Sequence, residues 1–280
     1  MKEKNNRALS AAATVKITTE GAYELHGQPI NIKSAIQAAI NGSISYVPDG
    51  FAAVMADADR QLATVNYTTR ITLVNNTVLE AAVNMQPHQY RVGCLNFASA
   101  KNPGGGFLGG AQAQEESLAR ASALYPTLTK HQEMYSFNKH RHTYLYSDYM
   151  VYSPDVPFFR NDADELIAHY PLSIITSPAV NVGAILQNKP SELVDVESTM
   201  LQRMDKVLAL FLHHKHTHLL LGAWGCGVFR NNPADVARWW AHYLLGNGKY
   251  AHCFEEVVFA VYDRSKTQDN ITAFKEMVKT

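Results

Sequence analysis

The residues best suited to chemistry in this sequence are Glu115 and Glu116, which follow a loop with five glycines. The glycines lie between Gly104 and Gly110, after an expected strand and before an expected helix that starts at Gln114. Glycine permits positive φ angles and lets a ligand approach the backbone without a Cβ in the way. Carboxylates in the first turn of the following helix are well placed beside a bound sugar. The pattern therefore predicts a site that holds a polar ligand and performs acid/base chemistry on it.

The two acids are expected to have different roles. Neighbouring residues of a helix point about 100° apart, so Glu115 and Glu116 cannot do the same work on one bond. Breaking a glycosidic bond needs a proton on the leaving oxygen and an activated water. One carboxyl group can supply both in turn if partial burial raises its pKa, while the other orients the sugar through a hydroxyl. Acids are also common in the first turn of ordinary helices, where they interact favourably with the helix macrodipole. The pair therefore indicates a site only because the glycine loop precedes it.

A second glycine loop, within residues 219–233, repeats the order of apolar strand, loop and helix. It contains Gly222, Gly225 and Gly227, and its backbone N–H groups can form an anion-binding nest below a helix N-terminus. A diphosphate fits this description, although the spacing matches neither a Walker A motif nor GxGxxG. Phe229 can pack against a ribose, and packing within the loop or core is the alternative for this ring and for Trp224.

Other candidate residues are weaker. Four histidines at positions 213, 214, 216 and 218 lie close in sequence, but no adjacent acid or cysteine completes a zinc ligand set. Cys226 has no histidine partner readable from the sequence, so a structural thiol is favoured over a nucleophile. Aromatic residues at 144, 146, 149, 152, 158 and 159 can stack a base but are expected to be mostly core. We expect no metal and no cofactor.

The composition excludes several classes of protein. Hydrophobic residues make up 46% of the 280 residues, which argues against disorder. Lys+Arg and Asp+Glu are both 25, so sequence-specific nucleic-acid binding is not expected, and Lys101, Arg120 and Arg230 beside the loops are expected to be solvated charges. Three distant cysteines, a polar N-terminus and short apolar runs predict a soluble cytoplasmic protein without disulfides or membrane contact.

Alternating strands and helices must position the two loops. Strands are expected at 71–74, 91–97, 149–153, 173–176, 217–221 and 257–262, and helices at 5–13, 32–39, 77–85, 114–124, 191–214, 233–245 and 267–278. Residues 15–18 have a β-like pattern, and Gly21 marks a turn. Thr77 and Ser191 are expected helix caps. This order predicts a mixed or parallel sheet with helices on both faces and ligand-binding loops at the carboxyl ends of its strands.

The sequence resembles the bacterial-type poly(ADP-ribose) glycohydrolases, a branch of the macrodomain superfamily. The family signature is a run of three glycines followed, after a short spacer, by Gln-Glu-Glu. Here it stands as residues 104–106 and 114–116, separated by seven residues. The second loop, residues 222–229, is similar to the diphosphate loop of the family. The resemblance covers most of the chain and is strongest at 96–126 and 217–233.

This resemblance implies a three-layer α/β/α macrodomain-like fold, with an N-terminal helical extension (1–60) packed on a catalytic core (61–280). It implies hydrolysis of ribose–ribose O-glycosidic bonds of poly(ADP-ribose), with ADP-ribose as product. Glu116 would be the acid/base residue, Glu115 would bind a hydroxyl of the distal ribose, and Phe229 would press this ribose toward Glu116. The expected substrate-binding residues are Asn102, Gly104, Gly105, Gly106, Gln114, Gly222, Gly225, Cys226, Gly227, Val228 and Phe229.

Two other functions are compatible with the same residues. One is hydrolysis of single ADP-ribosyl groups attached to protein or nucleic acid, because the same glutamate chemistry would serve. The other is a reader that binds ADP-ribose without cleaving it, which would have no need for the pair Glu115 and Glu116. The sequence does not separate the polymer from mono-ADP-ribosylated substrates.

Overall fold

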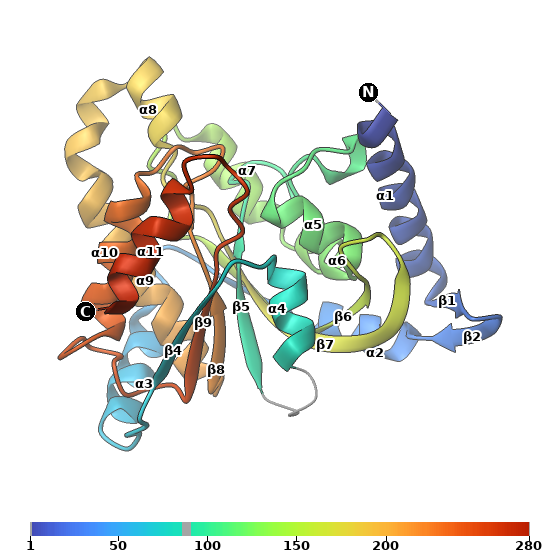
Figure 1. The fold of residues 1–280 in the computed structure, drawn as a ribbon, viewed down its shortest axis with the longest axis horizontal. Coiled ribbons are helices and arrows are strands. Elements are labelled where there is room, and N and C mark those ends of the chain that lie inside the picture. The colour runs from blue at the N-terminus through green and yellow to red at the C-terminus, as the bar shows by residue number, and fades with distance from the viewer. Residues whose placement is uncertain (1, 86–90, 280) are drawn as a thin grey trace.

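The computed structural model describes residues 2–85 and 91–279. A seven-stranded mixed sheet with the order β3-β6-β7-β5-β8-β9-β4 forms its centre (Figure 1). Its strands are β3 (Ile44–Tyr46), β4 (Arg70–Val74), β5 (Val92–Phe97), β6 (Met150–Arg160), β7 (Leu166–Ser177), β8 (His218–Leu221) and β9 (Glu256–Ala260). A separate antiparallel hairpin consists of β1 (Ala22–Leu25) and β2 (Gln28–Asn31).

Helices cover both faces of this sheet, which confirms the predicted α/β/α layers. One face carries α3 (Ala52–Leu62), α9 (Val196–His213), α10 (Pro233–Leu244) and α11 (Asp269–Lys279). The other carries α2 (Lys33–Gly42), α4 (Val78–Met85), α5 (Gln114–Ala121), α6 (Leu124–Thr129) and α7 (Gln132–His140). Next to these layers, α1 (Lys2–Glu20) lies beyond α5 (Figure 1), and α8 (Val182–Asn188) contributes Ile185 to the core beneath α9 and α10.

The two layers follow from the alternation of side chains along each strand. In β8, Leu219 and Leu221 belong to the core beneath α9 and α10, whereas Leu220 belongs to the core beneath α4 and α5. In β5, Leu95 belongs to the core beneath α9 and α10, and Cys94 belongs to the core beneath α4 and α5. All of these residues are fully buried, so the central strands are apolar on both faces.

Strand direction brings the two glycine loops to one edge. β5 runs parallel to β7 and β8, β8 runs parallel to β9, and β9 runs parallel to β4. Only the pairs β3–β6 and β6–β7 of this sheet are antiparallel. The loops after β5 and β8 therefore leave neighbouring strands at the same carboxyl edge, as predicted.

The expected β-like stretch at 15–18 is wrong, because α1 continues through it. The buried residues Ala11, Thr14 and Ile17 are spaced at three residues, which gives the helix one packed side. Thr18 and Thr19 donate their hydroxyls to Val15 O at 2.9 and 2.8 Å, one turn back. Packing against the rest of the protein thus overrides the β-propensity of these branched residues.

Two helix boundaries also differ from the expectation. Ser191 does not cap the long helix, since Pro190–Asp195 form a 3-10 turn and α9 begins at Val196. Val194 lies in that turn and is 83% exposed. The helix expected at 114–124 ends at Ala121 because Ser122 is extended and bridges to Phe158 of β6.

Several elements were not predicted: the β1–β2 hairpin, β3, α3, α6, α7, α8 and the full length of β6 and β7. Of these, β3 pairs with β6 and therefore contributes to the central sheet from within residues 1–60. The division at residue 60 stays a prediction. Among residues 2–85 and 91–279, no helix combines the length and apolarity needed to cross a membrane.

Candidate active site

The first glycine loop leaves β5 and folds against the start of α5. Gly104 and Gly105 have φ angles of 69° and 60°, in the left-handed region that strains other residues. A Cβ on Gly105 would lie 2.3 Å from Glu116 Oε1 and 3.2 Å from Glu115 Oε2. The loop can therefore approach both carboxyl groups only because residue 105 is glycine.

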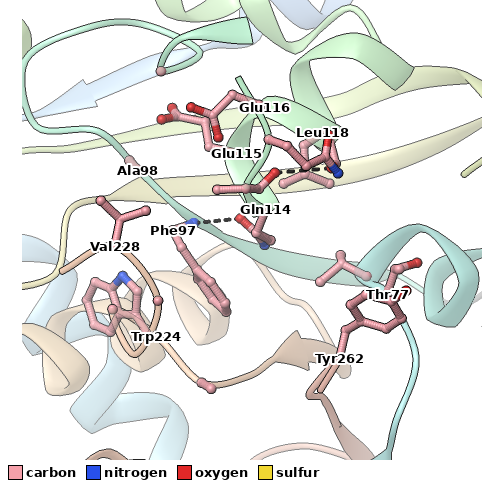
Figure 2. A pocket seen from close by; sticks show the side chains of 18 of the residues that line it. Thr77, Phe97, Ala98, Gln114, Glu115, Glu116, Leu118, Trp224, Val228 and Tyr262 are labelled. Carbon is pink, nitrogen blue, oxygen red and sulfur yellow. Dashed lines mark hydrogen bonds between the residues drawn. The ribbon is translucent and has the colours of Figure 1, made fainter. Parts of the chain in front are cut away.

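Gln114 fastens the first turn of α5 to the end of β5. Its Nε2 donates to Leu95 O at 2.8 Å. Its Oε1 accepts from Phe97 N at 2.9 Å, as Figure 2 shows. Both polar groups of the amide are thus engaged with backbone. Gln114 lines a cavity between the two glycine loops, but its hydrogen bonds position the helix that carries the two acids.

Glu115 is buried, with 3% of its surface exposed. Its Oε2 accepts from Ser99 N at 2.6 Å and its Oε1 accepts from Asn96 Nδ2 at 3.2 Å. Burial raises the pKa of Glu115 to about 8, against the effect of these hydrogen bonds, and the nearby Glu116 carboxylate also raises it. At neutral pH, Glu115 is therefore mostly protonated.

Glu116 is partly exposed and lines the cavity between the two glycine loops. Its Oε1 accepts from Gly106 N at 2.9 Å, so the glycine loop holds the carboxyl group in place. Figure 2 shows the carboxyl groups of Glu115 and Glu116 beside each other at the start of α5. A fixed carboxyl group that a ligand can reach is suited to general acid/base catalysis.

The second glycine loop is held in shape by Asn231. Asn231 Nδ2 donates to Val180 O at 2.8 Å and to Gly225 O at 3.1 Å, and Asn231 N donates to Gly225 O at 3.0 Å. Gly225 has a φ of 79°, and a Cβ on it would lie 2.5 Å from Asn231 Nδ2 and 2.6 Å from Ala179 Cβ. Glycine is needed here for both conformation and space.

Four amides of this loop form no hydrogen bond within the described part of the chain: those of Gly225, Gly227, Val228 and Phe229. The amide of Cys226, by contrast, donates to Ala223 O at 3.1 Å. Successive free N–H groups in a tight loop form a concave site for anions. The loop therefore has the donors that a phosphate group needs, without a lysine or arginine.

A cavity of about 690 Å³ lies between the two loops. Ligand pockets for compounds of drug-like size span about 300–1,000 Å³, so a nucleotide-sized ligand fits. Ten predicted site residues line it: Asn102, Gly105, Gly106, Gln114, Glu115, Glu116, Gly225, Gly227, Val228 and Phe229. The predicted convergence of the two loops on one space is thus present.

Three predicted site residues lie outside the lining of this cavity. A Cβ on Gly104 would lie 3.0 Å from the Phe107 ring, and one on Gly222 would lie 2.7 Å from Ala260 O, so both glycines permit tight packing. Burial raises the pKa of the Cys226 thiol to about 12, which keeps it protonated at neutral pH. That is consistent with the structural role expected for this thiol.

Phe229 packs within the fold and is also accessible from the cavity, so its contact with a ribose stays a prediction. Its ring packs at 5.9 Å from the ring of Tyr146, and the residue also lines the cavity. Trp224 is fully buried and donates Nε1 to Ser177 O at 3.2 Å, so it is mainly a core residue (Figure 2).

Several residues of the site were missed. Asn96 and Ser99 hold Glu115, and Asn231 holds the second loop. Thr77 and Tyr262, from the loops after β4 and β9, line the part of the cavity away from the acids. Asn96 had a usable signal, since it is strongly polar within the apolar run 92–97. Nothing in the sequence distinguishes Asn231 from its neighbour Asn232.

The expectation that Arg120 is a solvated charge is wrong. Its residue surface is 7% exposed, and its Nη1 donates to Ala111 O at 2.8 Å. Arg120 therefore braces the backbone between the first loop and α5. Arg230 is exposed as expected, and Lys101 is partly exposed.

The histidines near residue 215 have structural partners. His213 Nδ1 lies 2.7 Å from Asp57 Oδ2, and His216 Nε2 lies 3.0 Å from the Tyr152 hydroxyl. Within residues 2–85 and 91–279, no group of three or more His, Cys, Asp or Glu side chains is arranged to hold a metal ion. As expected, the aromatic residues between 144 and 159 are mostly buried.

Comparison with known proteins identifies relatives over nearly the whole length of the chain. The family model for the microbial-type PARG catalytic domain matches residues 11–161. The crystal structure of poly(ADP-ribose) glycohydrolase (PARG) from Thermomonospora curvata is similar at a TM-score of 0.92 and 40% identity, over 98% of this chain and 99% of that one. No match was found among curated proteins.

Some of the similar structures contain ligands. The same Thermomonospora curvata enzyme bound to the inhibitor ADP-HPD has a TM-score of 0.88 and 40% identity, over 97% of this chain and 99% of that one. The enzyme from Deinococcus radiodurans in complex with ADP-ribose has a TM-score of 0.83 and 40% identity, over 92% of this chain and 99% of that one.

Proposed function

This chain belongs to the microbial-type poly(ADP-ribose) glycohydrolase family and is a glycosidase, and we propose that it releases ADP-ribose from poly(ADP-ribose) with Glu116 as general acid and base. The observation that carries this assignment is the position of Glu116. Gly106 N holds its carboxyl group at the wall of the cavity that Gly225, Gly227, Val228 and Phe229 of the second loop also line.

In this mechanism, Glu116 donates a proton to the ribose oxygen that leaves when the glycosidic C–O bond breaks. The distal ribose then has the positive charge of an oxocarbenium-like state. A water molecule attacks the same ribose carbon, and the Glu116 carboxylate accepts its proton, which restores the acid. Both steps need one carboxyl group that is fixed and within reach of the ligand, as Glu116 is.

Glu115 binds a hydroxyl of the distal ribose. Because burial holds it mostly protonated at neutral pH, it adds little negative charge beside Glu116. Full charges on two such close carboxyl groups would repel each other, which would oppose the carboxylate form of Glu116 that activates water. Asn102, at the same end of the cavity, contacts this ribose as well.

The diphosphate binds the free amides of Gly225, Gly227, Val228 and Phe229, and the Phe229 ring presses the distal ribose toward Glu116. Backbone donors suit a diphosphate because they are fixed before the ligand arrives. The remaining part of the cavity, lined by Thr77 and the half-exposed ring of Tyr262, is left for the adenosine.

The test is Glu116→Gln, assayed for release of ADP-ribose from poly(ADP-ribose) and for binding of ADP-ribose by calorimetry. The amide keeps the shape and the hydrogen bond from Gly106 N but has no acidic proton. We expect release to fall by at least about 100-fold, the lower range for loss of general acid/base catalysis, with ADP-ribose affinity within about threefold of wild type. Full activity of this variant would refute the assignment.

The substrate class is tested with wild-type enzyme on a panel. It contains poly(ADP-ribose), peptides with a single ADP-ribosyl group on serine or glutamate, and ADP-ribosylated DNA. Preferred turnover of the polymer supports the proposal. Faster turnover of a mono-ADP-ribosylated substrate would reassign the enzyme to single ADP-ribosyl groups, and tight ADP-ribose binding without any turnover would favour a reader.

A further inference from the structure

A second cavity, of about 530 Å³, adjoins the first. It lies between α1, α5 and the turn that connects β6 to β7. Leu79, Gln112, Ser117 and Asp162 line both cavities, so the two spaces meet at these residues. Nothing in the mechanism above uses the second cavity.

Three guanidinium groups line this second cavity, those of Arg7, Arg120 and Arg160. Arg120 and Arg160 are only 7% and 8% exposed. Arg7 Nε donates to Gly110 O at 2.9 Å, and Arg160 Nη1 donates to Asp164 O at 2.9 Å. Backbone carbonyl groups thus fix the orientation of these guanidinium groups. This lowers the side-chain conformational entropy that is lost when a ligand binds.

The donors of these arginines are not all satisfied. Arg160 Nε is buried and makes no hydrogen bond within the described part of the chain, and its distance to Asp164 Oδ1 is 3.5 Å. Burial also lowers the pKa of Arg120 and Arg160, which reflects the loss of water around their charges. Since Asp164 already places a carboxylate 3.5 Å from Arg160, a bound anion would chiefly add hydrogen-bond acceptors for the two guanidinium groups.

The second cavity is close to the reacting bond. Arg120 follows Glu116 by one helical turn, on the same side of α5, and the Glu116 carboxylate raises the pKa of Arg120 against the effect of burial. Residues four apart on a helix lie about 5–6 Å from each other. A group bound by Arg120 and Arg160 would therefore belong to the part of the substrate next to the bond that is cut.

Carboxylates also line this cavity, and they limit what it can bind. Glu3, Asp162 and Asp164 balance the three arginines in formal charge. The Glu3 side chain is 93% exposed, Asp162 accepts from the Thr77 hydroxyl at 2.5 Å, and Asp164 accepts from the Ser10 hydroxyl. The cavity therefore does not attract polyanions in general, and favours an anion placed at the two buried guanidinium groups.

We propose that the second cavity binds the diphosphate of the ADP-ribose unit adjoining the unit in the first cavity. This inference rests on the proposed function, because poly(ADP-ribose) has one diphosphate in every unit. Guanidinium groups pair with phosphate oxygens in two parallel hydrogen bonds, which suits Arg120 and Arg160 better than it would suit lysines. The subsite would let the enzyme distinguish a chain from a single ADP-ribosyl group.

The test compares Arg160→Gln with wild type on two substrates. Poly(ADP-ribose) can fill both cavities, whereas the 4-nitrophenyl glycoside of ADP-ribose, cleaved at the same ribose carbon, fills only the first. We expect KM for the polymer to rise about tenfold in the variant, with kcat/KM for the nitrophenyl glycoside within about twofold of wild type. The second substrate also reports that the variant is folded.

Arg238→Gln is the matched control, since Arg238 is an exposed surface arginine paired with Glu197 on α9, outside both cavities. It should leave both substrates unchanged. Arg160→Lys provides a second variant: it keeps the positive charge, loses the paired N–H donors, and should raise KM for the polymer in the same selective way. Equal losses on both substrates, or an unchanged KM for the polymer, would overturn the subsite. A wild-type enzyme that fails to cleave polymer would instead refute the proposed function.

A dimer of two ADP-ribose units tests whether the leaving unit fills the second cavity. If it does, Arg160→Gln raises KM for the dimer as it does for the polymer. An unchanged KM for the dimer would overturn the subsite.

Discussion

Gly105 lies against the carboxyl group of Glu116 with no room for a side chain between them. A Cβ on Gly105 would be 2.3 Å from Glu116 Oε1, and the next amide, that of Gly106, donates to the same oxygen at 2.9 Å. The loop thus serves as a backbone clamp on the proposed acid/base residue. Its glycines are needed because the clamp must approach a carboxyl group closely and turn with positive φ.

Gly105→Ala should therefore damage catalysis more than binding. The methyl group would displace the Glu116 carboxyl group, and alanine at a φ of 60° adds strain of about 1–2 kcal/mol. A displacement of about 1 Å near the reacting bond can lower the rate about 100-fold, so we expect kcat to fall by that factor. Steady-state kinetics on poly(ADP-ribose) measures it.

Gly109→Ala is the control in the same loop. No atom lies within 4 Å of the Cβ position of Gly109, and its φ is not positive. This variant should keep kcat within about threefold of wild type, as ordinary surface substitutions do. Similar losses in both variants would mean that the loop tolerates no substitution at all, and the clamp on Glu116 would lose its support.

Gln114→Ala tests whether this side chain positions α5. The substitution leaves Leu95 O and Phe97 N without their partner at the edge of the cavity, and each unsatisfied group costs about 1–3 kcal/mol where it is buried. We expect a lower Tm and a reduced kcat with ADP-ribose affinity largely retained. Gln187→Ala, at an exposed position of α8, should change none of the three. A loss of affinity alone, with Tm and kcat unchanged, would indicate a direct contact with the ligand instead.

Glu115→Gln should change how stability depends on pH. The pKa of Glu115 is raised from 4.5 to about 8 in the folded protein, so the folded state holds this proton more tightly than the unfolded chain does. The stabilisation is complete below about pH 4.5 and is lost as the pH rises toward about 8. Each pKa unit corresponds to about 1.4 kcal/mol, which makes the effect on the order of a few kcal/mol.

Gln at position 115 cannot ionise and keeps similar shape. Asn96 Oδ1 has no hydrogen-bond partner within the described residues, so it can accept from the new amide once the Asn96 side chain is turned. We therefore expect the Tm of the wild type to fall relative to that of Glu115→Gln as the pH rises. Calorimetry of both proteins from pH 4.5 to 8.5 measures this difference. Parallel curves would show that Glu115 is already ionised at low pH.

The two loops could be predicted from the sequence because each carries a local signal. The glycines from Gly104 to Gly110 and the acids that follow them lie within one short stretch of sequence, and so do Gly222 to Gly227. The strands before them are short apolar runs, and parallel strands place their ends at one edge. Convergence of Gly105 and Gly225 on one cavity then follows from topology, without any knowledge of side-chain contacts.

What the sequence did not reveal depends on contacts between distant segments. Arg120 is bound to the first loop and α1 covers it, so the burial of this charge cannot be read from its neighbours. The helical state of residues 15–18 likewise results from packing and not from propensity. Asn231 was missed because its partners, Val180 and Gly225, come together only in the folded chain.

The neighbours Asn231 and Asn232 allow the second loop to be tested with a matched pair of variants. Asn231→Ala removes the hydrogen bonds from Nδ2 to Val180 O and Gly225 O, and these bonds hold the loop whose amides we assign to the diphosphate. We expect the loop to relax, ADP-ribose to bind about tenfold more weakly, and the protein to lose about 1–3 kcal/mol of stability.

Asn232→Ala also lowers stability, because the Asn232 side chain accepts from Ala234 N at 2.9 Å and caps α10, an interaction worth about 1 kcal/mol. Its side chain is exposed and does not line the cavity, so ADP-ribose affinity should stay at the wild-type value. Calorimetry with ADP-ribose and thermal unfolding of both variants separate the two effects. If affinity falls equally in both, the weakening follows from stability alone, and the loop geometry set by Asn231 is not what binds the diphosphate.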